Sequence, residues 1–236
     1  MNERAPNPTP DDWSIEPPIP ADVPSVMVFG GAFDPPHIGH VAPPIAARDA
    51  MGVGWLLYVP AARPPLKGAD PAASADDRIE MLRRALHGHD SVSVTDVELA
   101  RGGVSYMLDT LHALRDRLPA QISLRLLIGA DQAASLHRWR EPRRIIALAE
   151  PVVMLREDGD SADRLIARMA PHWSEAELAR WQQWIAPVPP RPACSTWVRE
   201  MLGAAGPDAP ALAHIVPPRV LEYIRARGLY GRRAAR

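Results

Sequence analysis

Val26-Met27-Val28-Phe29-Gly30-Gly31 is a short apolar run that ends in two glycines. Four consecutive apolar residues, two of them β-branched, are typical of a strand buried on both faces of a sheet. The glycines that follow let the backbone turn tightly into a helix. That helix is expected to reach about Met51, with Pro43 and Pro44 kinking it or delaying its start. The folded part of the chain is thus predicted to open with a strand, a glycine turn and a helix.

Similar apolar runs recur along the chain, separated by segments with helical periodicity. Further strands are expected at residues 55–60, 92–97, 124–129 and 152–155, with a short last one at 184–186. Helices are expected at residues 78–86, 105–118, 133–136, 142–149, 174–184, 196–202 and 217–227. Strands that alternate with helices predict an α/β fold, a Rossmann-like doubly wound parallel sheet with helices on both faces. Ligands of such folds bind beyond the carboxyl ends of the strands, where the strand order reverses.

The composition is that of a soluble globular protein: 236 residues, 47% hydrophobic and 23% charged. A formal net charge of −1 provides no general attraction to nucleic acid or to an anionic membrane, so neither is expected as a partner. The single cysteine, Cys194, excludes an internal disulfide and fits a reducing cytoplasm. The prolines and acids of residues 1–24 predict a flexible leader and no secretory signal. One domain at 25–231 and a basic tail at 232–236 are expected to follow.

Two histidines, His37 and His40, follow the glycine turn. Their three-residue spacing makes them neighbours on the first turn of the predicted helix. Both rings can there donate an N–H to one phosphate, which the positive end of the helix dipole also attracts. By spacing alone such a pair is more often structural than catalytic, and a metal site would have only Asp34 as a nearby carboxylate. The combination of strand, glycine pair and paired histidines favours stabilisation of a phosphoryl group during its transfer.

The segment His37-Ile38-Gly39-His40 resembles the T/HxGH signature of the nucleotidyltransferase superfamily. Class I aminoacyl-tRNA synthetases share this signature, so it does not choose the reaction by itself. The chain has no room for a tRNA-binding domain and no KMSKS-like lysine loop, which disfavours a synthetase.

Five further segments, in order along the chain, resemble the bacterial nicotinate-nucleotide adenylyltransferase family. They lie at residues 60–67, at 78–85, at 96–101 with the helix start Ser105-Tyr106-Met107-Leu108-Asp109-Thr110-Leu111, at 128–132 with Trp139 downstream, and at 194–199. The tail at residues 216–230 also matches. The resemblance therefore covers the chain from about residue 26 to residue 230.

The resemblance implies roles for several residues of these segments and of the opening motif. It implies that His37 and His40 are the catalytic residues. For ATP binding it implies Gly30, Gly31, Phe33, Lys67, Gly129, Asp131, Ser195, Thr196 and Arg199. For nicotinate mononucleotide it implies Ser105, Tyr106, Met107 and Trp139. Hydroxyls at a helix start and a planar guanidinium suit phosphate oxygens, and an indole suits a pyridine ring. Outside the family, each of these residues would be an ordinary helix cap, surface residue or core residue.

Four positions depart from the pattern of this family. Met107 stands where threonine is usual, Leu66 where the loop after the second strand has histidine, and Arg140 where an aromatic residue is common. Cys194 replaces the first serine of the late helix start. Most of these changes fall on the nicotinate side, whereas the ATP side is almost intact.

The reaction implied by the resemblance joins ATP and nicotinate mononucleotide to give deamido-NAD and pyrophosphate, in NAD biosynthesis. Mg²⁺ is expected to arrive with ATP, because no carboxylate cluster that would form a metal cage is apparent in the sequence. Two alternatives stay open. One is an adenylyltransferase with nicotinamide mononucleotide or phosphopantetheine as acceptor, and the other is a nucleotide-binding regulator without turnover.

Overall fold

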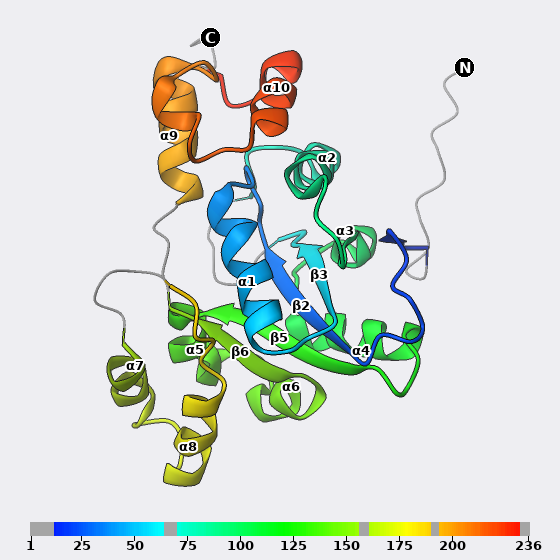
Figure 1. Ribbon diagram of the computed structural model, residues 1–236, viewed down its shortest axis with the longest axis vertical. Helices are drawn as coiled ribbons and strands as arrows, with labels where there is room; N and C mark the ends of the chain where they lie inside the picture. The colour runs from blue at the N-terminus through cyan, green and yellow to red at the C-terminus, as the bar shows by residue number, and fades with distance from the viewer. Residues whose placement is uncertain (1–11, 64–69, 156–160, 190–193, 232–236) are drawn as a thin grey trace.

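The computed structural model describes residues 12–63, 70–155, 161–189 and 194–231. A six-stranded sheet with the order β1-β4-β3-β2-β5-β6 lies at its centre (Figure 1). Five strands are parallel: β2 (Ser25–Gly31), β3 (Trp55–Pro60), β4 (Val92–Thr95), β5 (Ser123–Gly129) and β6 (Glu150–Met154). The chain moves outward from β2 to β4 and then returns to place β5 on the other side of β2. This reversal confirms the predicted doubly wound, Rossmann-like fold.

Helices cover both faces of the sheet, and each face has its own apolar core. One face carries α1 (Ala42–Ala50), α2 (Ala75–Leu86), α9 (Ser195–Ala205) and α10 (Pro218–Arg227). The other carries α3 (Val97–Arg101), α4 (Met107–Arg117), α5 (Ala130–Ser135), α6 (Pro142–Leu148), α7 (Ala162–Met169) and α8 (Glu175–Gln183). Three short 3-10 turns complete the described elements: η1 (Ile38–His40), η2 (Leu136–Arg138) and η3 (Pro210–Leu212). Among the described residues, no helix is long and apolar enough to cross a membrane.

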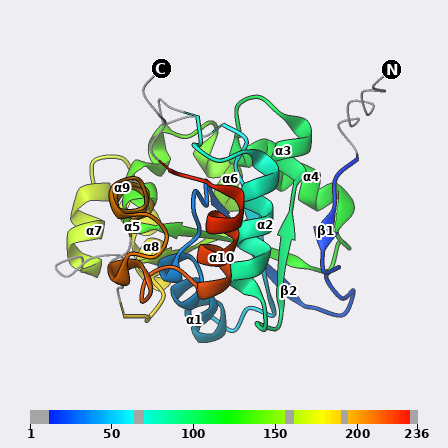
Figure 2. The ribbon, with the colours of Figure 1, turned by 90° about the horizontal axis from the view of Figure 1, so that it is seen from above.

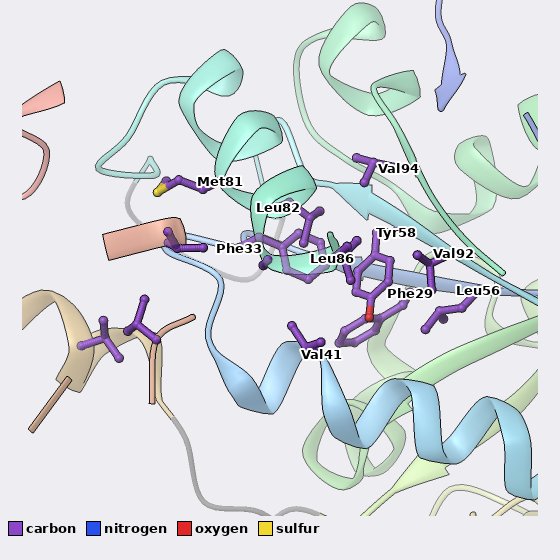
Figure 3. Close-up of a cluster of buried hydrophobic side chains, with 14 of the residues drawn as sticks. Phe29, Phe33, Val41, Leu56, Tyr58, Met81, Leu82, Leu86, Val92 and Val94 are labelled. Carbon is purple, nitrogen blue, oxygen red and sulfur yellow. The ribbon is translucent and has the colours of Figure 1, made fainter. Parts of the chain in front are cut away.

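The alternation of side chains along β2 explains why the two cores form. Met27 and Phe29 point to the face of α1 and α2, whereas Val26 and Val28 point to the face of α4. Figure 3 shows the first of these cores, where Phe29 lies among side chains from β3 and α2. A strand that buries both faces needs a continuous apolar run, which is the pattern of this segment in the sequence.

The last helix closes the domain by packing along α2 (Figure 2). Asp77 in the first turn of α2 connects the two helices, since its carboxylate accepts hydrogen bonds from Tyr223 (2.8 Å) and Arg227 (3.2 Å) of α10. Ser74, the N-cap of α2, donates a third at 2.7 Å. Although burial opposes ionisation, these hydrogen bonds lower the pKa of Asp77 below its usual 3.8. The charge of Asp77 thus stabilises the contact between α2 and α10.

The predicted flexible leader is wrong for residues 12–24. β1 (Ile15–Glu16) adds an antiparallel strand to β4, and Ser14 donates its N–H to Asp96 at 2.6 Å. The Trp13 side chain is buried, and the Arg117 guanidinium lies 4.5 Å from its ring centre. An edge strand leaves backbone groups unpaired, and this segment pairs some of them while it buries an aromatic ring. Residues 1–11 and the predicted tail at 232–236 lie outside the described residues.

Three predicted boundaries also differ from the structure. α1 begins only at Ala42, after the separate turn η1, because its first turn takes Pro43 and Pro44 where their missing N–H groups cost little. The strand expected to reach residue 97 ends at Thr95, and residues 97–101 form α3. The short strand expected at 184–186 is one parallel bridge, between Ile185 and Val153.

Candidate active site

The two glycines at the end of β2 have side chains close to where a Cβ would lie. A Cβ at Gly30 would lie 3.0 Å from Met107 Cε, and a Cβ at Gly31 would lie 3.0 Å from the ring of Phe33. Phe33 is 1% exposed and packs edge-on against Phe29 and His40, so its side chain belongs to the core (Figure 3). Any contact that Phe33 makes with a nucleotide must therefore come from its backbone.

The Asp34 carboxylate holds the loop after β2 in place. It is buried and accepts hydrogen bonds from the N–H groups of Ala72 (2.6 Å) and Ala73 (3.1 Å) and from the Tyr230 hydroxyl (2.6 Å). Burial, together with the adjacent carboxylate, raises the pKa of Tyr230. Three protein donors thus hold the Asp34 carboxylate, which acts as an anchor of this loop.

The paired histidines lie on the turn η1 and not on the longer helix that the sequence predicts. His37 is the N-cap of this turn and is almost fully buried, and its ring stacks on that of His40 with 3.8 Å between the ring centres. The N–H of Gly39 donates to Nδ1 of His37 (3.1 Å), and the N–H of His37 donates to Nδ1 of His40 (3.3 Å). A nitrogen that accepts a hydrogen bond is unprotonated, so the neutral rings carry their proton on Nε2. Both imidazoles are therefore N–H donors through Nε2.

The start of α9 is hydrogen-bonded to the histidine loop, the segment that leads from the end of β2 to the two histidines. The Arg199 guanidinium donates to the carbonyl of Asp34 (2.6 Å) and to the Thr196 hydroxyl (3.2 Å), and the Ser195 hydroxyl donates to the carbonyl of Pro35 (3.2 Å). The structure thus brings together the histidines and the three residues of α9 that the sequence predicts for ATP, although about 160 residues separate them in the chain.

Electrostatics at the start of α9 favour negative charge. The N–H groups of Trp197 and Thr196 and the charge of Arg199 lower the pKa of the Cys194 thiol, against the effect of its partial burial. These N–H groups belong to a helix N-terminus and have no partner within the helix, and backbone partial charges there add up to attract anions. Donors that stabilise a thiolate at this position are also suited to stabilise a phosphate.

A cavity of about 530 Å³ opens beside the switch point of the sheet. Its walls come from the end of β2, the start of α4, the strand β5 and the segment after η2. Six predicted site residues line it: Gly30, Gly31, Ser105, Tyr106, Met107 and Trp139. The residues predicted for nicotinate mononucleotide therefore meet in one cavity, next to the glycines at the end of β2.

A buried hydrogen-bond network supports the wall of this cavity. Glu98 of α3 lines it, is 3% exposed, and accepts a hydrogen bond from the Thr110 hydroxyl at 2.6 Å. Burial raises the pKa of Glu98, against hydrogen bonds from Ser105 and Thr110 that lower it. Ser105 in turn accepts the N–H of Ala62 at 2.9 Å. Ser105 thus has a structural role that connects the loop after β3 to the cavity.

Three residues predicted for ATP lie elsewhere or outside the described residues. Gly129 ends β5 as predicted, but Asp131 follows it in the first turn of α5, where its side chain is 79% exposed and pairs with Arg168 at 3.2 Å. Neither residue lines the cavity. Lys67 lies outside the described residues.

Arg78 is a site-forming residue for which the sequence predicts no role. Its buried guanidinium donates to the carbonyls of Ala32 (2.9 Å) and Ala61 (2.8 Å) and so joins the loops after β2 and β3. One signal was available, because Arg78 falls on the same helix face as Met81 and Leu82. A single arginine on an apolar helix face indicates a buried charge with specific acceptors.

Comparisons with known proteins agree with this arrangement. Residues 28–201 match the family model described as "Cytidylyltransferase-like". A protein of Gemmatimonas aurantiaca named "Probable nicotinate-nucleotide adenylyltransferase" is 35% identical over 204 residues, which cover 86% of this chain and 90% of the relative. A protein of Gloeobacter violaceus with the same name is 37% identical over 208 residues, 86% of this chain and 94% of the relative.

The fold also resembles a solved structure, that of Plasmodium falciparum nicotinic acid mononucleotide adenylyltransferase complexed with NaAD. The TM-score is 0.68 at 13% identity, and the match covers 87% of this chain and 97% of the other. At that identity the likeness is evidence for the fold alone, so the assignment depends on the family model and on the relatives. The chain belongs to the nicotinate-nucleotide adenylyltransferase family of cytidylyltransferase-like nucleotidyltransferases.

Proposed function

We propose that this protein transfers the adenylyl group of ATP to nicotinate mononucleotide, giving deamido-NAD and pyrophosphate in NAD biosynthesis. The observation that carries the proposal is the junction of the stacked pair His37 and His40, the start of α9 and the loop after β2. This junction lies where an α/β sheet binds nucleotides, beside a cavity large enough for a mononucleotide base and sugar.

The chemistry requires positioning and charge stabilisation and needs no general base. A phosphate oxygen of nicotinate mononucleotide attacks the α-phosphorus of ATP, and the bond from that phosphorus to the oxygen of the departing pyrophosphate breaks. The acceptor phosphate is already ionised, so no proton has to be removed. His37 and His40 would donate from Nε2 to phosphate oxygens as negative charge builds up.

Phosphates of ATP would lie at the start of α9. Ser195 and Thr196 offer hydroxyls, and Arg199 offers a planar guanidinium that the carbonyl of Asp34 already orients. Lys67 would add a further positive charge. The backbones of Gly30, Gly31 and Phe33 would approach the nucleotide from β2.

The adenosine would lie at the end of β5. Gly129 would allow close approach of the backbone there, and Asp131 would accept hydrogen bonds from ribose hydroxyls. Its ion pair with Arg168 is exposed and therefore weak, so a ribose can displace it at little cost.

The acceptor would occupy the cavity. Trp139 would stack on the pyridine ring, and Ser105, Tyr106 and Met107 would surround the nicotinate end. Met107 and Leu108 line the cavity in the first turn of α4, whose N-cap makes no side-chain cap. The backbone N–H groups of this turn would thus be available to a carboxylate.

Mg²⁺ would enter as part of its complex with ATP. No group of three or more metal-ligating side chains occurs in the described ranges, and the Asp34 carboxylate already accepts three hydrogen bonds from the protein. Phosphate oxygens and water are the usual Mg²⁺ ligands in such sites. We also propose a cytoplasmic location, where ATP is available and a single free cysteine stays reduced.

Release of pyrophosphate from MgATP tests the proposal. It is measured with nicotinate mononucleotide, nicotinamide mononucleotide and phosphopantetheine as acceptors in turn, and we expect the first to give the highest kcat/KM. A higher value with either of the others would transfer the assignment to that acceptor. ATP binding without pyrophosphate from any acceptor would instead indicate a regulator without turnover.

A further inference from the structure

Two arginines, Arg138 and Arg140, line the cavity, one on each side of Trp139 in the sequence. Trp139 is the residue proposed to stack on the pyridine ring. Both arginines are its neighbours in the sequence, and the pyridine ring carries the group that differs between acid and amide. Nicotinate carries a carboxylate with one negative charge, and nicotinamide carries a neutral amide at the same ring position. A cation in this cavity can therefore distinguish the two acceptors by charge.

The contacts of Arg140 direct it to the start of α4. Its Nη1 lies 3.3 and 3.4 Å from the two carboxylate oxygens of Asp109, and its Cζ lies 5.5 Å from the ring centre of Tyr106. Tyr106 is the N-cap of α4 and Asp109 belongs to the first turn. The guanidinium is thus adjacent to the helix N-terminus that lines the cavity with Met107 and Leu108.

The ion pair between Arg140 and Asp109 is weak enough to exchange. Charge-assisted hydrogen bonds of this kind are normally about 2.7–2.9 Å long, and both contacts here are longer. The side chains are 52% and 38% exposed, so water and salt screen the attraction. A carboxylate that enters the cavity can replace Asp109 as the hydrogen-bond partner of the Arg140 guanidinium. Before that, the ion pair with Asp109 holds the guanidinium near the site.

We propose that Arg140 is the residue that selects nicotinate over nicotinamide, by donating from its guanidinium to the ring carboxylate. The inference deepens the proposed function and depends on it. Backbone N–H groups of α4 can donate to an acid or to an amide oxygen alike, so they discriminate little by charge. Arg140 adds a full positive charge that only the acid neutralises. Arg138 ends η2 on the other side of Trp139, and it is Arg140 that contacts the α4 segment.

Steady-state pyrophosphate release with the two mononucleotides tests this assignment. We expect Arg140→Gln to lower kcat/KM for nicotinate mononucleotide by about 10- to 100-fold, the range of one hydrogen bond to a charged group. The value for nicotinamide mononucleotide and the KM for ATP should change by less than about threefold, a surface-charge effect. Arg140→Lys, which keeps the charge, should retain part of the preference. Raising the salt concentration should reduce the preference of the wild type.

Two further arginines serve as comparisons. Arg144 is exposed, pairs with Glu141 at 2.6 Å and does not line the cavity, so Arg144→Gln should match the wild type with both acceptors. Arg138→Gln should keep the ratio of the two kcat/KM values within about threefold. A change of that ratio in Arg138→Gln but not in Arg140→Gln would overturn the assignment. An equal loss with both acceptors in Arg140→Gln would also overturn it, since that is the result expected of a structural role.

The failure of the inference is distinguishable from failure of the proposed function. An active wild type whose preference is the same in Arg140→Gln would reject the role of Arg140 alone. A folded wild type that releases no pyrophosphate with any acceptor would reject both. Circular dichroism of each variant separates loss of selectivity from loss of fold, which we do not expect at a half-exposed side chain.

Discussion

Gly30 and Gly31 are neighbours in β2, yet an added methyl group would meet different surroundings at the two positions. A Cβ at Gly31 would lie 3.0, 3.1 and 3.3 Å from three ring atoms of Phe33. That ring is 1% exposed and packs against Phe29 and Tyr58, so it has no free space into which to move (Figure 3). A Cβ at Gly30 would meet only the terminal Cε of Met107, a flexible side chain that borders the cavity.

The expected difference in stability follows from these contacts. Overpacking a well-filled core costs about 1–3 kcal/mol, whereas exchanging glycine for alanine stabilises by about 0.4–1 kcal/mol through the unfolded chain. Because both variants make the same exchange in the same strand, the second effect cancels when they are compared. We expect Gly31→Ala to unfold with a free energy about 1–3 kcal/mol lower than Gly30→Ala. In a chain of this size that corresponds to a Tm lower by about 2–12 °C.

Urea and thermal unfolding followed by circular dichroism measure this difference, with the wild type as reference. Gly30→Ala should unfold within about 1 kcal/mol of the wild type, because Met107 can rotate away. It should nevertheless raise the KM for nicotinate mononucleotide, since the displaced side chain moves into the cavity. Equal stability of the two variants, or a lower stability of Gly30→Ala, would refute the argument that the fixed ring of Phe33 requires glycine at position 31.

Three further outcomes are expected. His40→Ala should lower turnover by about a hundredfold or more while the fold is retained, because a key charge-stabilising donor is lost; turnover near that of the wild type would reject its catalytic role. Tyr230→Phe removes the hydrogen bond to Asp34 and should cost about 1–3 kcal/mol in urea unfolding, and an unchanged midpoint would argue against this bond as a loop anchor. Asp77→Asn should be less stable than the wild type at neutral pH. Since the folded-state pKa of Asp77 is lowered, its contribution is present above pH 4 and is lost as the pH falls through that pKa, so the two stabilities should converge in acid.

Local patterns were sufficient to predict the parallel strands and the nucleotidyltransferase signature. The run at residues 26–29 predicts a buried strand because only continuous apolar residues suit a strand covered on both faces. The order of motifs from His37 to Arg199 identified the family, which the relatives confirm. The roles of the individual site residues stay predictions, and the structure adds positions for them.

Where local patterns failed, a distant partner was the reason. Residues 12–24 have the proline-rich composition of a flexible segment, yet they fold because β4 offers an unpaired edge and Trp13 finds a place in the core. Arg78 resembled an ordinary helix arginine until its two carbonyl acceptors were visible on loops 46 and 17 residues away. Arg140 was only a departure from a family pattern until its contacts with Tyr106 and Asp109 placed it beside the cavity.

The sequence by itself determined the parallel strands, most of the helices and the family, because these depend on short-range periodicity and on local motifs. Only the tertiary structure decided that α9 bonds to the histidine loop, that Nδ1 of both histidines accepts a backbone N–H, and that Asp34 anchors the loop after β2. These properties depend on which groups meet across long stretches of chain and on the direction of single hydrogen bonds, which no local pattern encodes.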